Sequence, residues 1–199
     1  LFEQVKKSLH ELSSQRKSAA TLLGKEVSKE LAALSMPNGQ FEIRVSTEEI
    51  DEKSDIKESG ADEVEMLFSS HGGNLLPISK AASGGELSRL LLAIELTLAG
   101  KNRLETYVFD EVDAGIGGKA ALEVGKRLRQ LADDAQVIVV THLPQVALWA
   151  DHHVVVEKSE NGAVTSSALR IVDGEERESE IARMLSGLEE SEHAQDHAR

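Results

Sequence analysis

The sequence has no cysteine, few aromatic residues and no long apolar run. The absence of cysteine excludes disulfide bonds and thiolate catalysis, and it fits a reducing cytosol. Because there are only four Phe, one Tyr and one Trp among 199 residues, a core has to be built from Leu, Ile, Val and Ala. No run approaches the roughly 18 apolar residues of a membrane-spanning helix. The start also lacks a signal-peptide pattern, so we expect no membrane partner.

Positive charge is also scarce. The formal net charge of −13 argues against nucleic-acid binding by this chain alone. The charge is uneven, because residues 1–35 carry six Lys/Arg and four Asp/Glu, whereas residues 48–65 carry nine acids and two lysines. Such an acidic run is typical of a solvated loop, with a docking site as the alternative.

A phosphate-binding loop of the form GxxxxGK[ST] is missing from the whole sequence. The chain begins at Leu1 instead of Met, and we expect it to be a piece of a longer polypeptide.

The pattern of apolar residues predicts an α/β fold. Residues 1–35 have roughly heptad spacing, with Arg16 on the apolar seam, and predict either one helix of a coiled coil or a helix packed on its own domain. Alternating residues at 41–45 and 64–68 predict a hairpin across the acidic loop. The apolar runs 107–109 and 137–140 are typical of parallel strands and are separated by a helix near 119–131. A helix over 86–100, a hairpin at 154–157 and 168–172, and a helix at 178–185 complete the pattern.

Ser83-Gly84-Gly85-Glu86 precedes the apolar stripe of the helix predicted over 86–100. The free N–H groups and the positive dipole end of a helix N-terminus attract phosphate, and glycine lets the backbone come close. The simpler interpretation is an ordinary helix cap. The longer string from Ser79 to Arg89 is more specific than the four-residue motif.

Asp110-Glu111 and Thr141-His142 each follow an apolar strand. Of two carboxylates at a strand end, one can hold Mg²⁺ and the other can activate water. A histidine in the equivalent place can hydrogen-bond a phosphate. Each pair alone fits an ordinary strand end, but together with the Ser83 motif the order and spacing predict one ATP-hydrolysing site. Residues 112–118 lie where such ATPases place a loop that contacts the opposite subunit, with a glycine-rich helix approach as the alternative.

Three strings, SKAASGGELSR, YVFDEVDAGIGG and VIVVTHLPQVALWAD, resemble the RecN family of bacterial DNA-repair proteins, which are relatives of the SMC proteins. The similarity is specific over residues 75–199, and residues 1–74 agree in layout. It implies the fold of the C-terminal half of an ABC/SMC-type head, a P-loop NTPase-like α/β fold with a mainly parallel sheet. For the division into domains, the resemblance implies an arm helix at 1–36 and a head lobe at 37–199.

The resemblance also implies a division of labour within an ATP- and Mg²⁺-dependent ATPase. Asp110 would help hold Mg²⁺, Glu111 would activate water, and His142 would sense the γ-phosphate. The partners implied are the N-terminal half of the same head, a second head and DNA, in a cytoplasmic, nucleoid-associated protein that repairs double-strand breaks. The other implied residues are a signature motif that contacts ATP on the second head (Ser83, Gly84, Gly85, Glu86) and a dimer-interface loop (Asp113, Ala114, Gly115).

Without the phosphate-binding loop, we expect this chain alone to be inactive. Two alternatives stay open at this point. One is another SMC-like or ABC-type ATPase head. The other is a non-catalytic interaction module that keeps the fold.

Overall fold

A computed structural model describes residues 2–48, 57–81, 83–98, 105–161 and 164–186. The chain forms two compact units, residues 1–105 and 106–199. The predicted division into an arm helix at 1–36 and a lobe at 37–199 stays a prediction. The acidic run lies partly in 49–56, outside the described residues, as do residues 162–163 between the two strands of the predicted hairpin.

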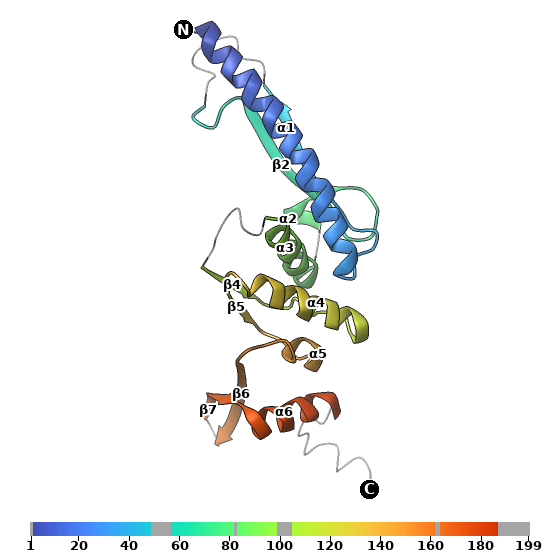
Figure 1. Ribbon diagram of the computed structural model, residues 1–199, viewed down its shortest axis with the longest axis vertical. Helices are drawn as coiled ribbons and strands as arrows, with labels where there is room; N and C mark the ends of the chain where they lie inside the picture. The colour runs from blue at the N-terminus through green and yellow to red at the C-terminus, as the bar shows by residue number, and fades with distance from the viewer. Residues whose placement is uncertain (1, 49–56, 82, 99–104, 162–163, 187–199) are drawn as a thin grey trace. The chain divides into compact units, whose positions relative to one another are not determined.

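The first unit combines a long helix with an antiparallel sheet (Figure 1). Helix α1 (Phe2–Ala33) lies along strand β1 (Gln40–Thr47), which pairs with β2 (Asp62–Ser69). The short strand β3 (Leu76–Pro77) extends this sheet. Helices α2 (Ile78–Ala81) and α3 (Gly84–Leu98) follow, and α3 packs against α1.

Helix α1 packs on its own unit through one apolar face. From Ala20 to Leu31 its buried residues recur every three or four positions, as an α-helix requires for a single face. At Gly24 the helix approaches β1 so closely that a Cβ would lie 3.1 Å from the Phe41 carbonyl oxygen. The Ser28 hydroxyl accepts the Phe41 N–H at 2.9 Å and reinforces this contact. The assignment of residues 1–36 to a coiled coil stays a prediction, because a coiled coil needs a second helix to pair with this one.

The contact with Asp62 explains why a cation, Arg16, lies on the apolar seam of the helix. The buried carboxylate of Asp62 accepts hydrogen bonds from Ser13 Oγ (2.6 Å), Arg16 Nη1 (3.0 Å) and Thr47 Oγ1 (2.9 Å). The Ser13 hydroxyl lowers the pKa of Asp62 most, and Arg16 and Thr47 lower it further, against burial, which raises it. The cluster therefore ties the middle of α1 to both strands of the hairpin.

The second unit begins with a parallel pair of strands. Strands β4 (Thr106–Phe109) and β5 (Gln136–Val139) are joined through helix α4 (Gly118–Leu131), and Phe109 lies opposite Val139. Helix α5 (Pro144–Ala147) packs against α4. The hairpin of β6 (His153–Asn161) and β7 (Val164–Val172) and helix α6 (Gly174–Ser186) complete the unit.

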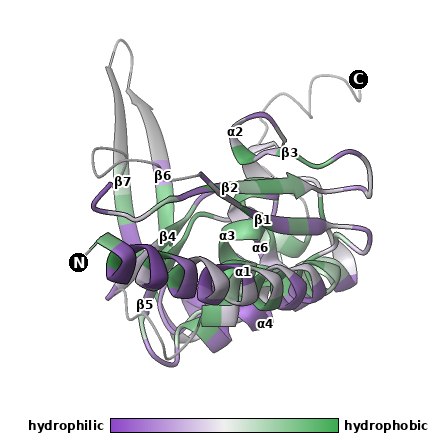
Figure 2. Cartoon of the chain, turned by 90° about the horizontal axis from the view of Figure 1, so that it is seen from above, coloured by the Kyte–Doolittle hydropathy of each residue, from purple (hydrophilic) through white to green (hydrophobic). Residues whose placement is uncertain are grey.

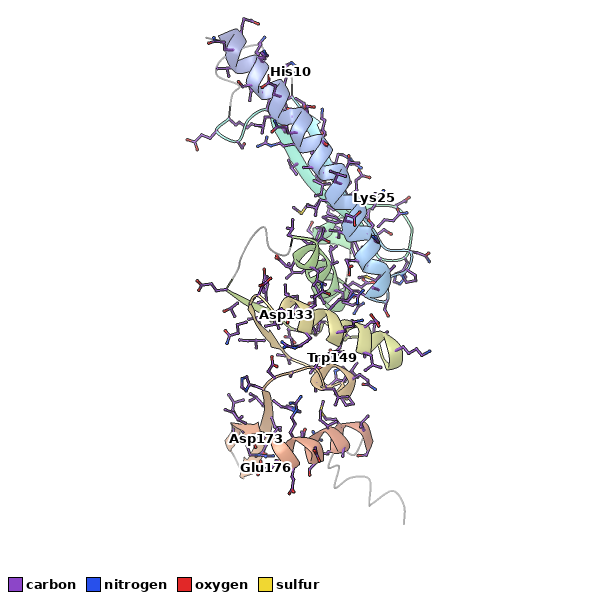
Figure 3. The ribbon with its side chains drawn as sticks, viewed as in Figure 1. His10, Lys25, Asp133, Trp149, Asp173 and Glu176 are labelled. Carbon is purple, nitrogen blue, oxygen red and sulfur yellow. The ribbon has the colours of Figure 1, made fainter. Side chains whose placement is uncertain are left out.

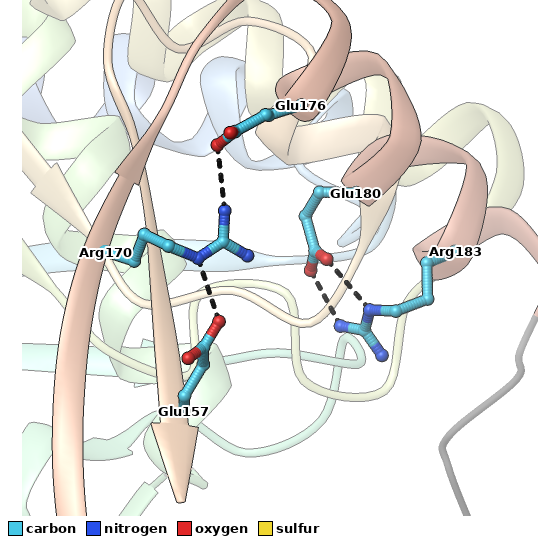
Figure 4. Close-up of polar contacts among 5 residues, drawn as sticks. All are labelled: Glu157, Arg170, Glu176, Glu180 and Arg183. Carbon is cyan, nitrogen blue, oxygen red and sulfur yellow. Dashed lines mark hydrogen bonds and ion pairs between the residues drawn. The ribbon is translucent and has the colours of Figure 1, made fainter.

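Charged side chains fix α6 to its neighbours. Arg170 on β7 bonds both Glu157 on β6 (2.9 Å) and Glu176 on α6 (3.0 Å), as Figure 4 shows. Arg177 donates to three backbone carbonyls at the end of α5, those of Ala147, Leu148 and Ala150. Helix α6 is therefore held by the hairpin on one side and by α5 on the other.

The α/β class agrees with the prediction, and the strands of the described residues form separate parallel and antiparallel sheets. Parallel pairing within the described ranges is confined to β4 and β5, and the other ladders are antiparallel. The reason is connectivity, since a hairpin needs only a short loop whereas parallel neighbours need a crossover such as α4. None of the helices described is long and apolar enough to cross a membrane.

Two strand faces of the second unit expose aliphatic side chains, and Figure 2 shows the hydropathy of each element. Val108 and Ile138 are opposite each other on β4 and β5, and Val140 follows on the same face. On the hairpin, four exposed residues share one face: Val154, Val156, Leu169 and Ile171. A two-stranded sheet is marginal by itself, so these faces suit further packing.

Candidate active site

The Ser83 motif forms the N-terminal cap of α3. The Ser83 N–H donates to Glu86 Oε2 at 2.9 Å, and the Glu86 N–H donates to Ser83 Oγ at 3.4 Å. The Ser83 hydroxyl also donates to the same Glu86 oxygen at 3.2 Å. This reciprocal pattern is a capping box, which satisfies backbone donors that a helix start leaves open. Gly84 is exposed and Gly85 is buried.

Glu86 is held in its charged form by its surroundings. Burial raises its pKa, but hydrogen bonds from the Ser83 backbone and from the Ser70 and Ser83 hydroxyls outweigh burial and lower it. His71 also lowers this pKa, with its Nδ1 3.8 Å from Glu86 Oε1. Ser70 and His71 were missed by the sequence analysis, because only the fold brings the end of β2 beside α3. The nucleotide-binding role of these motif residues stays a prediction.

Asp110 and Glu111 follow β4, in which Tyr107 and Phe109 are buried and Val108 faces outward. The Glu111 N–H donates to Asp110 Oδ1 at 2.9 Å, and both side chains are exposed. Glu111 has φ = 56°, a left-handed conformation that is uncommon for a residue with a side chain. Such conformations cluster at functional sites, where the surrounding structure maintains them.

Asp113 joins the loop after β4 to the residues after β5. Its side chain is only 2% exposed, and its Oδ2 accepts the Thr141 hydroxyl and the His142 N–H, the latter at 3.3 Å. The imidazole Nδ1 of His142 lies 3.5 Å from the same oxygen. The imidazole itself is exposed, so His142 combines a fixed backbone with a ring in solvent.

The loop that follows Asp113 contains Gly115 and Gly118, which both have positive φ. The Ala114 N–H donates to the Glu111 carbonyl at 2.9 Å, and the Ile116 N–H to the Asp113 carbonyl at 3.3 Å. Gly115 (φ = 73°) is exposed, and a Cβ there would meet no atom within 4 Å. Gly115 is therefore open to solvent, whereas the Asp113 side chain is used inside the unit. The dimer-interface assignment of Asp113, Ala114 and Gly115 stays a prediction.

The structure thus brings Asp110, Glu111, Asp113 and His142 to the carboxyl ends of two adjacent parallel strands. The Ser83–Glu86 motif belongs to the other compact unit.

Asp110 offers the hard carboxylate oxygens that Mg²⁺ prefers. Within the described ranges no three His, Cys, Asp or Glu side chains form a group that could hold a metal by themselves. Mg²⁺ in nucleotide sites is held by one or two carboxylates together with phosphates and water, so this donor set fits that use.

Known proteins that are similar to this chain in sequence include bacterial DNA-repair proteins. No family model matches the chain. DNA repair protein RecN of Streptomyces coelicolor is 49% identical over 94% of this chain, and that of Mycobacterium leprae is 45% identical over 100% of this chain. RecN of Halalkalibacterium halodurans is 35% identical over 94% of the chain. This chain is a relative of the RecN proteins. It spans about a third of the length of these RecN relatives, 34%, 36% and 33% respectively.

Solved structures give the same fold. The Smc head domain with a coiled coil and joint from Pyrococcus yayanosii superposes with a TM-score of 0.56 at 22% identity, over 91% of this chain and 33% of that one. The Smc head domain from Pyrococcus furiosus, solved with an extended coiled coil, gives 0.53 at 20% identity, over 94% of this chain and 42% of that one. The similarity to RecN and the α/β fold of an SMC head both agree with the sequence analysis.

Proposed function

We propose that this chain is the C-terminal part of an ATP-hydrolysing, SMC-like protein that repairs DNA double-strand breaks by recombination. The observation that carries the proposal is the grouping of Asp110, Glu111 and His142 at the ends of β4 and β5, where the Asp113 carboxylate joins the loop after β4 to Thr141 and His142. The similarity to RecN over nearly the whole chain supports it. The protein would be cytoplasmic and nucleoid-associated.

Each side chain at the strand ends has a separate proposed task. Bound Mg²⁺ would neutralise phosphate charge, and Asp110 would hold it through a carboxylate oxygen. Glu111 is exposed beside Asp110, and it would accept a proton from the attacking water as a general base. The exposed imidazole of His142 would contact the terminal phosphate, which fits a ring in solvent on a fixed backbone.

The Ser83–Glu86 motif would act on a nucleotide held by a second head. Ser83, Gly84 and Gly85 lie at the start of the 15-residue helix α3, where backbone N–H groups and the helix dipole favour an anion. Because the Ser83 hydroxyl is bonded to Glu86 in this structure, it would have to exchange that bond for a phosphate oxygen. This arrangement requires two heads, with Ala114 and Gly115 at their contact.

The N-terminal half of the head is the other proposed partner. It would supply the phosphate-binding loop, whose sequence this chain lacks. The exposed aliphatic face of β4 and β5, formed by Val108, Ile138 and Val140, supports association with further chain. DNA binding belongs to the complete protein, because this part is strongly acidic.

The test is hydrolysis of Mg-ATP after mixing this chain with the separately made N-terminal half of the parent head. We expect activity only in the mixture. Glu111→Gln should reduce kcat by about 100-fold or more while ATP binding is kept, because the general base is lost but the phosphate contacts are not. Glu123→Gln, an exposed glutamate on α4, is the matched control and should leave kcat unchanged.

Two results would contradict the proposal. Normal hydrolysis by the Glu111→Gln mixture would remove the role given to Glu111. Assembly of the two halves with no hydrolysis at all would favour the non-catalytic interaction module.

A further inference from the structure

Asp113 is buried, with only 2% of the residue exposed. A carboxylate removed from water is costly unless donors satisfy it. The hydrogen-bond donors found here come from the turn after β5, namely the Thr141 hydroxyl and the His142 N–H at 3.3 Å, and the His142 ring nitrogen Nδ1 lies 3.5 Å from the same oxygen. They converge on the single oxygen Oδ2, so the carboxylate is directed at this turn.

The turn is fixed from both sides. While the Thr141 hydroxyl donates to Asp113, it accepts the N–H of Leu143 at 3.0 Å. Leu143 is the N-cap residue of α5, and α5 packs against α4 and α6. The backbone on either side of His142 is therefore held, and its ring is the part left in solvent.

We propose that Asp113 is a positioning residue that fixes both the place and the tautomer of the His142 imidazole. A carboxylate beside Nδ1 favours a neutral ring with its proton on Nδ1, which leaves the Nε2 lone pair facing outward. That nitrogen accepts a hydrogen bond when the ring is neutral and donates one only when the ring is protonated. Contact with a phosphate oxygen would then require the imidazolium form, whose charge Asp113 balances. The inference rests on the role proposed above for His142.

The structural part of this inference is tested on the chain itself by NMR. Long-range ¹H–¹⁵N spectra report which ring nitrogen carries the proton, and His142→Gln assigns the signal among the seven histidines. We expect an Nδ1-protonated ring in the original chain. In Asp113→Asn, the amide oxygen can still accept from Thr141 and from the His142 N–H, but the charge beside Nδ1 is gone. We therefore expect loss of the Nδ1-protonated signature with the backbone signals of the turn retained.

Matched variants separate positioning from a general structural role. Asp133→Asn is the same substitution at an exposed site of the second unit and should leave the ring signal unchanged. If Asp113→Asn does not fold, Thr141→Val removes the hydroxyl with little change of shape. It should release the backbone of the turn, so the His142 ring and amide signals should broaden. If the NMR signal of the His142 ring is unaltered in a variant that folds, Asp113→Asn or Thr141→Val, the proposal is overturned.

The catalytic part is tested in the mixture with the N-terminal half. Asp113→Asn should lower kcat by about 10- to 100-fold with KM nearly unchanged, because misplacing a catalytic group by about 1 Å can cost 100-fold. An unchanged kcat would overturn the catalytic relevance of the contact. If the unaltered mixture hydrolyses no ATP, the proposed function fails, whereas the ring measurement still decides whether Asp113 positions His142.

Discussion

At the scale of single residues, Gly125 lies in a tightly packed part of the second unit. It lies in α4, and a Cβ there would be 2.3 Å from Cδ1 of Trp149 and 3.1 Å from the Gln145 carbonyl oxygen (Figure 3 labels Trp149). In Gly125→Ala, overpacking should cost about 1–3 kcal/mol, against a gain of about 1 kcal/mol in helix propensity. We expect the free energy of unfolding in urea to fall by about 1 kcal/mol. The fluorescence of Trp149, the only tryptophan, should change as well.

A double-mutant cycle tests the cause. In a Trp149→Ala background the ring is absent, so Gly125→Ala should stabilise α4 by its propensity alone, about 0.5–1 kcal/mol. Equal effects of Gly125→Ala in both backgrounds would show that Trp149 is not the obstacle.

The sequence was sufficient to place single residues at strand ends, but it was not sufficient to predict which side chains contact them. Asp110, Glu111 and His142 could be placed at strand ends because each follows a short apolar run. The contact of Asp113 with Thr141 could not be predicted, since it depends on the register that sets Phe109 opposite Val139, 30 residues away. The neighbours of Glu86 were missed for the same reason, because Ser70 and His71 reach it only through the fold.

At the scale of elements, Asp62 holds α1 on the hairpin of β1 and β2. In Asp62→Asn the amide can replace the hydrogen bonds to Ser13 and Thr47, but the ion pair with Arg16 is lost. We expect the free energy of unfolding at pH 7 to fall by about 2 kcal/mol, since hydrogen bonds to charged groups are worth about 1.5–3 kcal/mol. Asp133→Asn, which removes an exposed carboxylate 3.9 Å from Arg129, should change it by less than about 0.5 kcal/mol. Equal effects of the two variants would contradict the role of Asp62.

The same carboxylate makes the stability depend on pH. The pKa of Asp62 is lower in the folded chain than in the unfolded one, with the Ser13 hydroxyl as the largest favourable cause. Its contribution is therefore complete above the unfolded pKa of about 3.9 and is lost as the pH falls through the folded pKa. Urea unfolding of the original chain and of Asp62→Asn should thus give a difference that is constant from pH 7 to about pH 5 and shrinks below about pH 4. A difference that grows on acidification would contradict this assignment.

Elements with an apolar period or a continuous apolar run were predictable, and short elements with neither were not. The helices α1, α3 and α4 and the strands β1 and β2 were expected close to their observed bounds because each has an apolar period of its own. The four-residue strands β4 and β5 were expected from their continuous apolar runs. The four-residue helices α2 and α5 and the two-residue strand β3 were not predicted. Elements of that length contain too few residues to show a period, and packing decides their conformation.

At the scale of the whole molecule, the proposed function gives this chain pieces of a site that other parts complete. The Ser83–Glu86 motif and the Asp110–His142 group are in separate compact units. The chain spans about a third of the RecN proteins it matches. Motif order and spacing predicted one site because they indicate a common family, whereas in the proposed function the geometry that unites the motifs depends on further partners. Predictions at this scale are therefore predictions about assembly.

The exposed aliphatic face of β4 and β5 gives the most specific prediction about assembly. Burying an aliphatic side chain such as Ile138 is worth about 1.5–3 kcal/mol, and placing a charge there costs more. If the N-terminal half of the head covers this face, Ile138→Lys should weaken binding of that half by at least about tenfold in calorimetry, while thermal unfolding of the chain alone stays nearly unchanged. The control is Leu122→Lys on α4, because the exposed fractions of the two residues are similar, 41% for Leu122 and 47% for Ile138. Equal affinities for the two variants would place the docking surface elsewhere.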